Sequence, residues 1–292
     1  MPITALPRWS RSGSALLALA VACGLMAAAP PGAARERQPG VPFRSVFPIT
    51  GLDANWWVAQ YDHPADWFRT GWRNDGLTQE EGGLRFALRP TEAEDRVAPE
   101  AIAADDGALM RAGKTSKPFT SGQLQRRGWY GHGRYEVILR PASGRGLITA
   151  FYVYTGPHFG DPQREIDIEF LGRDTNRVYV NRFIDGAPLE EPPWLKLGFD
   201  AADRPRLYAF EWSPERLVWY AGETEIFRLE GADEVPQPPA KIYVDLWAGG
   251  QNQTYWSGNA PEDASGEALL QCVSFVPAGG SQGQCSDLLN GS

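Results

Sequence analysis

The sequence predicts an all-β fold, a β-sandwich that forms one domain. Three observations lead to this prediction. Short apolar stretches recur between turns that are rich in Gly and Pro, which is typical of sandwiches. Stretches with helical periodicity and end caps are scarce. Hydrophobic residues make up 42% of the 292 residues, which is enough for a sizeable core, and no internal repeat divides the chain.

The expected strands alternate in character with period two or form continuous apolar runs. In the first of them, Tyr135, Val137 and Leu139 share one face. Residues 213–215 and 221–223 have turn-forming compositions, so the three strands around them should form a meander. In chain order, the predicted strands cover residues 134–140, 147–154, 164–172, 207–212, 217–220, 225–229, 241–247 and 268–275.

The N-terminus has the pattern of a secretory signal. Arg8 and Arg11 precede an apolar stretch at 15–29, which is too short to cross a membrane comfortably. Small residues follow, up to a cleavage site near Ala34. The pattern predicts a signal peptide over residues 1–34 and a secreted or periplasmic protein.

Two segments should follow the signal peptide. Residues 35–45 are polar and contain Pro, which predicts a flexible leader, and residues 46–292 form the single domain. Cys23 lies inside the apolar stretch, so a lipoprotein anchored at this cysteine is an alternative to a freely secreted protein. That lipid anchor is the only membrane association we expect.

Removal of the signal peptide would leave two cysteines, Cys272 and Cys285. In an oxidising compartment such a pair predicts one disulfide that closes a short C-terminal loop. Two free thiols are the alternative.

The charge and aromatic content restrict the class of ligand. The net charge of −8 argues against a nucleic-acid partner and suits a neutral polymer, although local charge can differ from the total, so acidic substrates stay compatible. The eleven Trp are more than a core of this size requires. They indicate either exposed platforms for a ligand or an unusually bulky core. We expect a monomer.

The segment R-E-I-D-I-E-F-L-G at 164–172 is the most informative in the chain. On a strand its acidic residues, Glu165, Asp167 and Glu169, share one face. Three like charges in a row repel each other and raise at least one pKa, so that one carboxyl stays protonated near neutral pH.

Retaining glycoside hydrolysis requires this asymmetry. One carboxylate attacks the sugar and a protonated one donates to the leaving oxygen, with the two carboxyls about 5–5.5 Å apart. The backbones of Glu165 and Glu169 lie roughly 13 Å apart on a straight strand, so their side chains must lean together. Asp167, between them, could hydrogen-bond one of the two. A solvated strand face and a site for a hard cation are the alternatives.

Six segments in order carry a resemblance to a known family. Together they are similar to glycoside hydrolase family sixteen, in particular to bacterial lichenases (endo-β-1,3-1,4-glucanases) and exopolysaccharide-trimming endoglycanases, over about residues 66–276. The segments are G-W-Y-G-H-G-R-Y-E-V (128–137), F-Y-V-Y-T-G-P (151–157), E-I-D-I-E-F-L-G (165–172), L-G-F-D-A (197–201), Y-A-F-E-W-S-P (208–214) and D-L-W-A-G (245–249).

The resemblance implies a curved β-jelly-roll sandwich of the concanavalin A-like class, with a concave substrate cleft. It implies that Glu165 is the nucleophile, Glu169 the general acid/base and Asp167 an assisting carboxylate. It also implies substrate contacts, for each of which packing is the alternative explanation. These residues are Trp72, Asn74, Gln123, Tyr152, Tyr154, Asn181, Phe183, Asp245 and Trp247.

Several positions depart from the lichenase pattern. Gln123 stands in place of a sugar-binding Glu, Gln125 in place of an Arg, and Phe183 in place of a Tyr. Asp245 stands where the lichenases have an Asn. Strict lichenase specificity is therefore not implied. The position of a calcium-binding carboxylate in some relatives is Gln271 here, and we predict neither a metal nor a cofactor.

We expect a retaining endo-β-glucanase that hydrolyses β-1,3-1,4-linked or related β-glucan. One alternative is an endoglycanase or transglycosylase that acts on a bacterial exopolysaccharide, which would fit the altered contacts. An alternative of another class is an inactive carbohydrate-binding module. The intact trio of Glu165, Asp167 and Glu169 argues against a pure binder.

Overall fold

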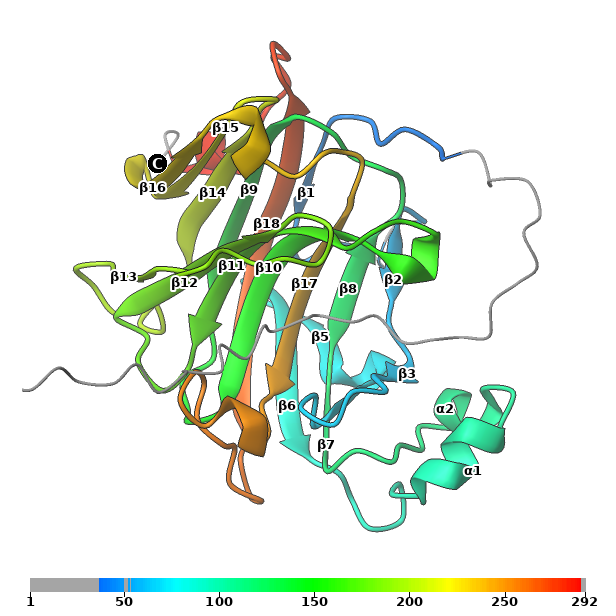
Figure 1. The fold of residues 1–292 in the computed structure, drawn as a ribbon. Helices are drawn as coiled ribbons and strands as arrows, with labels where there is room; N and C mark the ends of the chain where they lie inside the picture. Colours follow the sequence, from blue (N-terminus) through cyan, green and yellow to red (C-terminus); the bar gives the residue numbers. More distant parts are fainter. Residues whose placement is uncertain (1–36, 50–51, 53, 290–292) are drawn as a thin grey trace, which may run out of the picture.

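Two mainly antiparallel sheets packed face to face make up the protein (Figure 1). The structure is a computed structural model that describes residues 37–49, 52 and 54–289. The all-β sandwich expected from the sequence is confirmed. The predicted signal peptide at 1–34 and the candidate lipidation site Cys23 lie outside the described residues.

Seven strands form the sheet that carries the acidic segment. Each strand pairs antiparallel with its neighbours, and the paired residues can be followed from strand to strand across the sheet. In spatial order they are β13 (Trp194–Lys196), β12 (Arg177–Phe183), β11 (Arg164–Leu171), β10 (Leu147–Thr155), β17 (Lys241–Ala248), β8 (Gln123–Arg126) and β2 (Trp56–Val58).

Eleven strands form the second sheet. Its spatial order is β16 (Thr224–Glu230), β15 (Arg216–Ala221), β14 (Arg206–Trp212), β9 (Gly133–Arg140), β18 (Gly266–Pro277), β6 (Gly83–Pro90), β7 (Phe119–Ser121), β4 (Thr70–Trp72) and β3 (Tyr61–Asp62). In addition, β1 (Phe43–Val46) pairs with β18, and β5 (Leu77–Glu80) pairs with β6. All eight predicted strands are present to within two residues, and β14, β15 and β16 form the predicted meander.

The core lies between the two sheets. From β11, Ile166, Ile168 and Phe170 are fully buried there, and the ring centroid of Phe170 lies 4.7 Å from that of Tyr208 on β14. Trp219 of β15 crosses this layer and donates its indole N–H to the backbone oxygen of Asp167 at 3.0 Å. Because the apolar side chains of β11 point inward, its acidic side chains must point outward.

The segment 37–45 differs from the flexible leader that its polar composition predicts. The Arg37 guanidinium pairs with Asp161 at 2.7 Å and lies 4.4 Å from the ring centroid of Trp129. Strand β1 starts at Phe43, inside the predicted leader, and alternates buried and exposed residues along β18. Anchoring by single side chains, which composition does not reveal, holds this segment on the domain.

Two short helices between β6 and β7 are a feature that strand periodicity did not predict. They are α1 (Pro99–Ala104) and α2 (Ala108–Arg111). Pro99 occupies the first turn of α1, and the Asp105 carboxylate accepts a hydrogen bond from the Leu109 backbone at 2.7 Å. Each is too short to show a clear helical period. No helix in the described part of the chain is long and apolar enough to span a membrane.

The described part of the chain also contains five short 3-10 helices, four between strands and the last after β18. They are η1 (Asn74–Gly76), η2 (Pro157–Phe159), η3 (Ala232–Glu234), η4 (Gln251–Gln253) and η5 (Cys285–Leu288).

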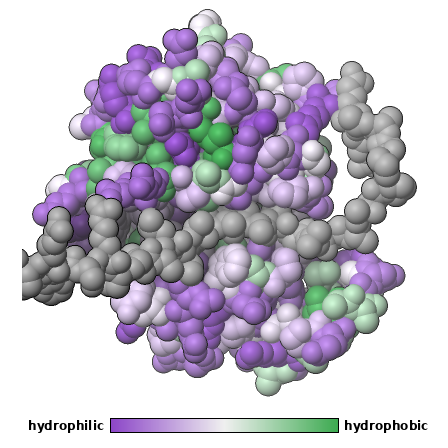
Figure 2. All heavy atoms as spheres, in the orientation of Figure 1, coloured by the Kyte–Doolittle hydropathy of each residue, from purple (hydrophilic) through white to green (hydrophobic). Residues whose placement is uncertain are grey.

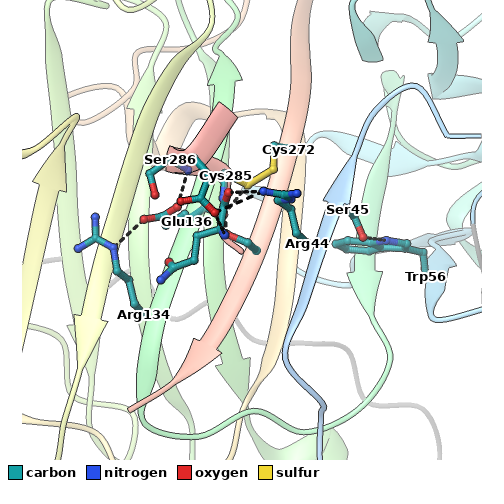
Figure 3. The surroundings of a disulfide bond; sticks show 11 residues. Arg44, Ser45, Trp56, Arg134, Glu136, Cys272, Cys285 and Ser286 are labelled. Carbon is teal, nitrogen blue, oxygen red and sulfur yellow. Dashed lines mark hydrogen bonds and ion pairs between the residues drawn. A yellow bond between two sulfur atoms is a disulfide. The ribbon is translucent and has the colours of Figure 1, made fainter. Parts of the chain in front are cut away.

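Cys272 and Cys285 form a disulfide, as predicted (Figure 3). The bond attaches η5 to β18, and the buried Glu136 carboxylate strengthens this attachment. Glu136 accepts hydrogen bonds from the Ser286 backbone at 2.8 Å and from Arg134 Nε at 2.6 Å. The C-terminal turn is therefore fixed to the eleven-stranded sheet, away from the acidic segment of β11.

The surface is hydrophilic over most of the face seen in Figure 2. Hydrophobic residues gather in its upper left, near the strands labelled β14 and β16 in Figure 1. The edges of the sandwich carry partly buried apolar side chains that pack against the main core, including Leu195, Phe199 and Ile226. Such scattered apolar edges are ordinary for a two-sheet fold.

Candidate active site

Strand β11 carries Glu165, Asp167 and Glu169 on the side of the seven-stranded sheet that faces away from the core. We call this side the carboxylate face. The three side chains are almost inaccessible, with exposed fractions of 1%, 3% and 7%. Charged groups are seldom buried without a functional or structural reason, because burial costs free energy.

Cross-strand register arranges the carboxylate face in three rows, each containing one acidic residue of β11. These rows pass from β12 across β11 and β10 to β17, and two of them continue onto β8. The Glu165 row is Phe183, Glu165, Tyr154 and Lys241. The Asp167 row is Asn181, Asp167, Tyr152, Tyr243 and Gln125. The Glu169 row is Tyr179, Glu169, Ala150, Asp245 and Gln123.

A fourth carboxylate, Asp245, joins the trio from β17. Only the small Ala150 separates it from Glu169 along their row. Burial raises the pKa of Glu169 well above its usual value, and the negative charges of Asp167 and Asp245 raise it further. Burial, followed by the charge of Glu165, likewise raises the pKa of Asp167. The cluster therefore retains protons near neutral pH.

Glu165 differs from Glu169 in its hydrogen bonding. Burial raises the pKa of Glu165, but Gln163 Nε2 donates to Glu165 Oε2 at 2.8 Å and opposes this rise, while the charge of Glu169 adds to it. Because the charge of Glu169 raises the pKa of Glu165, the two carboxyls lie close enough to interact electrostatically. This agrees with the expectation that their side chains lean together. A donor fixed on Glu165 favours its ionised form, so the proton is better held by Glu169.

Asp245 and Gln123, two of the departures from the lichenase pattern, contact each other directly. Gln123 Nε2 donates to Asp245 Oδ2 at 2.8 Å, and the Tyr152 hydroxyl donates to the same oxygen at 3.0 Å. Burial raises the pKa of Asp245 to about 7, while these two hydrogen bonds act in the opposite direction. Where the lichenase pattern pairs Glu with Asn, this chain pairs Gln with Asp. The carboxylate therefore stands on β17, the strand nearer Glu169, instead of on β8.

Two predicted contacts on β12 lie beside the trio. Asn181 is opposite Asp167, and its Oδ1 accepts hydrogen bonds from the backbones of Arg182 at 2.9 Å and Leu189 at 3.1 Å. Its carbonyl is thus occupied, and a contact to a sugar would be made by Nδ2. Phe183 is opposite Glu165 and buried. Register thus brings both side chains, like Tyr152 and Tyr154, onto the carboxylate face.

The predicted Trp72 and Trp247 lie in an aromatic cluster beyond the Glu169 row. Phe68 joins them, with its ring centroid 5.6 Å from Trp72 and 4.3 Å from Trp247. Both indoles are at most 2% exposed, so packing accounts for much of their surface, and their stacking on sugars stays a prediction.

Asn74 lies apart from the three rows. It is exposed in η1, beside Asp75, whose carboxylate pairs with Arg89 of the other sheet. Its contact with a sugar also stays a prediction.

A groove of about 1600 Å³ lies over β8 and β17, beside the three acidic residues of β11, which do not themselves line it, and it includes residues that we did not predict. Gln123 lines it together with Tyr243, Lys241 and Trp57 of the same sheet. Since Asp245 and Trp247 were predicted, period-two alternation along β17 was the signal that could have identified Tyr243 and Lys241. Met110 and other residues of the helices α1 and α2 form part of the opposite wall.

Within the described residues, no group of three His, Cys, Asp or Glu side chains is placed to hold a metal ion.

Residues 65–263 match the family described as Glycosyl hydrolases family 16. Among curated proteins, the chain is 42% identical over 120 residues to the Beta-glucanase of Bacillus amyloliquefaciens, which covers 41% of this chain and 49% of the relative. It is 36% identical over 166 residues to a Beta-glucanase of Acetivibrio thermocellus, covering 56% and 48%. The chain thus spans about half the length of the curated relatives that it matches.

Solved structures give a longer overlap. A prokaryotic beta-1,3-1,4-glucanase (lichenase) derived from a mouse hindgut metagenome superimposes with a TM-score of 0.69 at 27% identity, covering 82% of this chain and 100% of that one. The Bacillus licheniformis beta-glucanase superimposes with a TM-score of 0.68 at 29% identity, covering 82% and 99%. The sandwich is therefore of the jelly-roll class that the sequence implied.

Proposed function

This chain belongs to the glycosyl hydrolases of family 16, and we propose that it is a retaining endo-β-glucanase that cleaves β-1,3-1,4-linked or related β-glucan. The observation that carries the proposal is the row of Glu165, Asp167 and Glu169 on one face of β11, with the pKa of each raised by burial. The curated relatives named Beta-glucanase support the class of substrate.

The first step would form a covalent intermediate. Glu165, whose ionised form is favoured by the hydrogen bond from Gln163, attacks the anomeric carbon. As the glycosidic bond breaks, Glu169 transfers its proton to the leaving oxygen, so that a free sugar hydroxyl and an ionised Glu169 result. Burial and the neighbouring charges of Asp167 and Asp245 keep this proton on Glu169 until it is needed.

The second step would release the product. The ionised Glu169 removes a proton from water, and the water oxygen replaces Glu165 at the anomeric carbon. Both carboxyls return to their starting protonation states. Asp167 lies between Glu165 and Glu169 and is either ionised or protonated. Its backbone oxygen accepts a hydrogen bond from Trp219 of the opposite sheet. We assign Asp167 the role of tuning the two pKa values rather than reacting itself.

A bacterial exopolysaccharide is the second candidate substrate. The exchange of Glu and Asn for Gln123 and Asp245 favours it, because this pair lies in the Glu169 row where a sugar hydroxyl would bind. The buried Asp245 has a pKa of about 7, so near neutral pH it is partly ionised and partly protonated. It therefore offers a sugar hydroxyl different hydrogen-bond donors and acceptors from those of an Asn. A pure carbohydrate-binding module is disfavoured, since binding alone gains nothing from four crowded acids.

We also propose that the chain is exported, by secretion or to the periplasm, either free or lipid-anchored at Cys23. The disulfide Cys272–Cys285 supports this proposal, because such bonds persist in oxidising compartments.

A reducing-sugar assay of the full chain on a polysaccharide panel tests the proposed activity. The panel holds mixed-linkage β-glucan, laminarin, xyloglucan, agarose and a bacterial exopolysaccharide, and Glu165→Gln serves as the inactive control. Cleavage of mixed-linkage glucan that is lost in the control supports the β-glucanase proposal. Cleavage of the exopolysaccharide alone supports the second substrate, and absence of cleavage throughout would contradict both.

A further inference from the structure

The Glu165 row ends in a positively charged region on β17 and the segment after β8, although the chain carries a net charge of −8. Lys241, the first residue of β17, is opposite Tyr154, which is itself opposite Glu165. Two strand spacings place the Lys241 backbone about 10 Å from that of Glu165. Arg127 directly follows β8 beside β17, and Arg37 lies across Trp129.

Lys241 is held rigidly but has no acidic partner. Its Nζ donates to the Gly128 oxygen at 3.2 Å and lies 4.7 Å from the ring centroid of Trp129 and 5.7 Å from that of Phe159. Within the described residues, no carboxylate forms an ion pair with Lys241 or Arg127. Burial and the charges of Arg127 and Arg37 lower the pKa of Lys241 to about 8.

Glu165 lies in the same row but, among the described residues, the acidic side chain that binds one of these cations is Asp161, which pairs with Arg37 at 2.7 Å. Three cations against one carboxylate leave an excess of positive charge. Holding cations together and partly out of water costs free energy that a neutral glucan chain does not repay. Because Lys241, Arg127 and Phe159 line the same groove as Gln123 and Tyr243, a bound glycan chain would reach them.

The two ends of the groove differ in the groups they offer. Beyond Glu169 the groove is lined by Trp67 and Phe68, and the cation there, Arg69, is paired with Glu262 at 2.6 Å. At the Glu165 row the groove offers the half-buried ammonium of Lys241, which lies beside the rings of Trp129 and Phe159, and the exposed Arg127. This difference in charge favours a neutral sugar on the Glu169 side of the cleaved bond and a charged sugar on the Glu165 side.

We propose that the Glu165 end of the groove binds an anionic group on the glycan, a carboxylate or sulfate carried by a sugar one or a few units from the cleaved bond, through Lys241 and Arg127. The proposal rests on the proposed glycoside hydrolase function and specifies its substrate class. Lys241 supplies two N–H groups besides the one bonded to Gly128, and Arg127 supplies a planar set of donors.

Derivatives of one backbone provide the test. Mixed-linkage β-glucan is carboxymethylated, sulfated or, as the neutral control, hydroxyethylated to the same low degree, and kcat/KM is measured on each at 0.05 M and 0.5 M NaCl. We expect the wild-type enzyme to prefer an anionic derivative over the neutral one by about tenfold, as two partly exposed ion pairs would give. The preference should fall towards one at 0.5 M NaCl. The larger of the two anionic preferences identifies carboxylate or sulfate.

Variants locate the effect. Lys241→Gln and Arg127→Gln should each reduce the ratio of anionic to neutral kcat/KM severalfold, and Lys241→Arg should keep it. Arg204→Gln, which removes an exposed positive charge elsewhere, should leave the ratio as in the wild type. Equal kcat/KM on charged and neutral derivatives, with clear cleavage of both, overturns this inference but not the proposed function.

A binding measurement separates the two proposals in the other direction. Glu165→Gln protein is run in native gels that contain either the carboxymethylated or the hydroxyethylated glucan. Stronger retardation by the charged polymer, abolished by adding Lys241→Gln, supports the anionic subsite even when no substrate is cleaved. Equal retardation by the two polymers counts against it.

Discussion

Replacing Asp245 by Asn removes one of the four carboxylates from the carboxylate face while keeping its shape. The Asn oxygen can still accept from Gln123 Nε2 and from the Tyr152 hydroxyl, which now bond to Asp245 at 2.8 and 3.0 Å. The change therefore isolates the effect of the charge. It also restores the residue type of the lichenase pattern at this position.

The magnitude follows from the pKa of Asp245, which burial raises from its ordinary 3.8 to about 7. Below about pH 4 this carboxyl is protonated in the folded and the unfolded protein, and it costs nothing. Between pH 4 and 7 the unfolded chain releases the proton while the folded protein keeps it, so stability is lost as the pH rises. Above pH 7 the full cost, about 4 kcal/mol, is present.

Urea unfolding of the wild type and of Asp245→Asn, at intervals from pH 4 to pH 8, measures this difference. We expect the variant's gain in unfolding free energy to be small at pH 4 and to approach about 4 kcal/mol at pH 8. Asp233→Asn, which removes an exposed carboxylate, is the control and should change stability by less than about 0.5 kcal/mol at every pH. A gain for Asp245→Asn that does not vary with pH would refute the reasoning.

Three further predictions concern the rest of the site and the fold. Asp245→Asn should also move the alkaline limb of the pH profile of kcat/KM to lower pH, because the charge of Asp245 helps to raise the pKa of Glu169; an unmoved limb contradicts this coupling. Gln163→Leu should lower kcat on mixed-linkage glucan by roughly tenfold or more, since it removes a hydrogen bond to the ionised Glu165, and unchanged kcat would show that this bond has no catalytic role. Replacing Cys272 and Cys285 by Ser should lower the unfolding free energy by about 3 kcal/mol, as expected for a loop closed over 13 residues, with kcat/KM at 25 °C unchanged because the bond lies away from the groove.

The elements with a strong periodic signal were predictable from the sequence. The alternation of β11 determines which residues enter the core, so the outward direction of Glu165, Asp167 and Glu169 followed from spacing alone. The meander followed from the turn chemistry around Pro214 and Gly222. These features depend on neighbours in the chain, which is the information a single sequence contains.

Features that depend on contacts between distant segments were not predictable. The helices α1 and α2 are too short to show a period, and segment 37–45 is ordered by Arg37 and by pairing with β18. The sequence identified Gln123 and Asp245 as departures, but only the register between β8 and β17 reveals that they bond to each other. The charge of the groove's Glu165 end likewise requires the register of β17 against β10.

The central claim is that Glu165 attacks the sugar and Glu169 handles the proton, and azide rescue tests it most directly. Glu165→Ala and Glu169→Ala are each incubated with azide and an aryl β-glycoside of a glucan oligosaccharide with a good leaving group, and the anomer of the glycosyl azide is determined by NMR. We expect the α-azide from Glu165→Ala, since azide enters from the face the nucleophile has vacated, and the β-azide from Glu169→Ala, since azide attacks the intermediate on Glu165. The opposite pair of anomers, or the same anomer from both variants, would contradict the assignment.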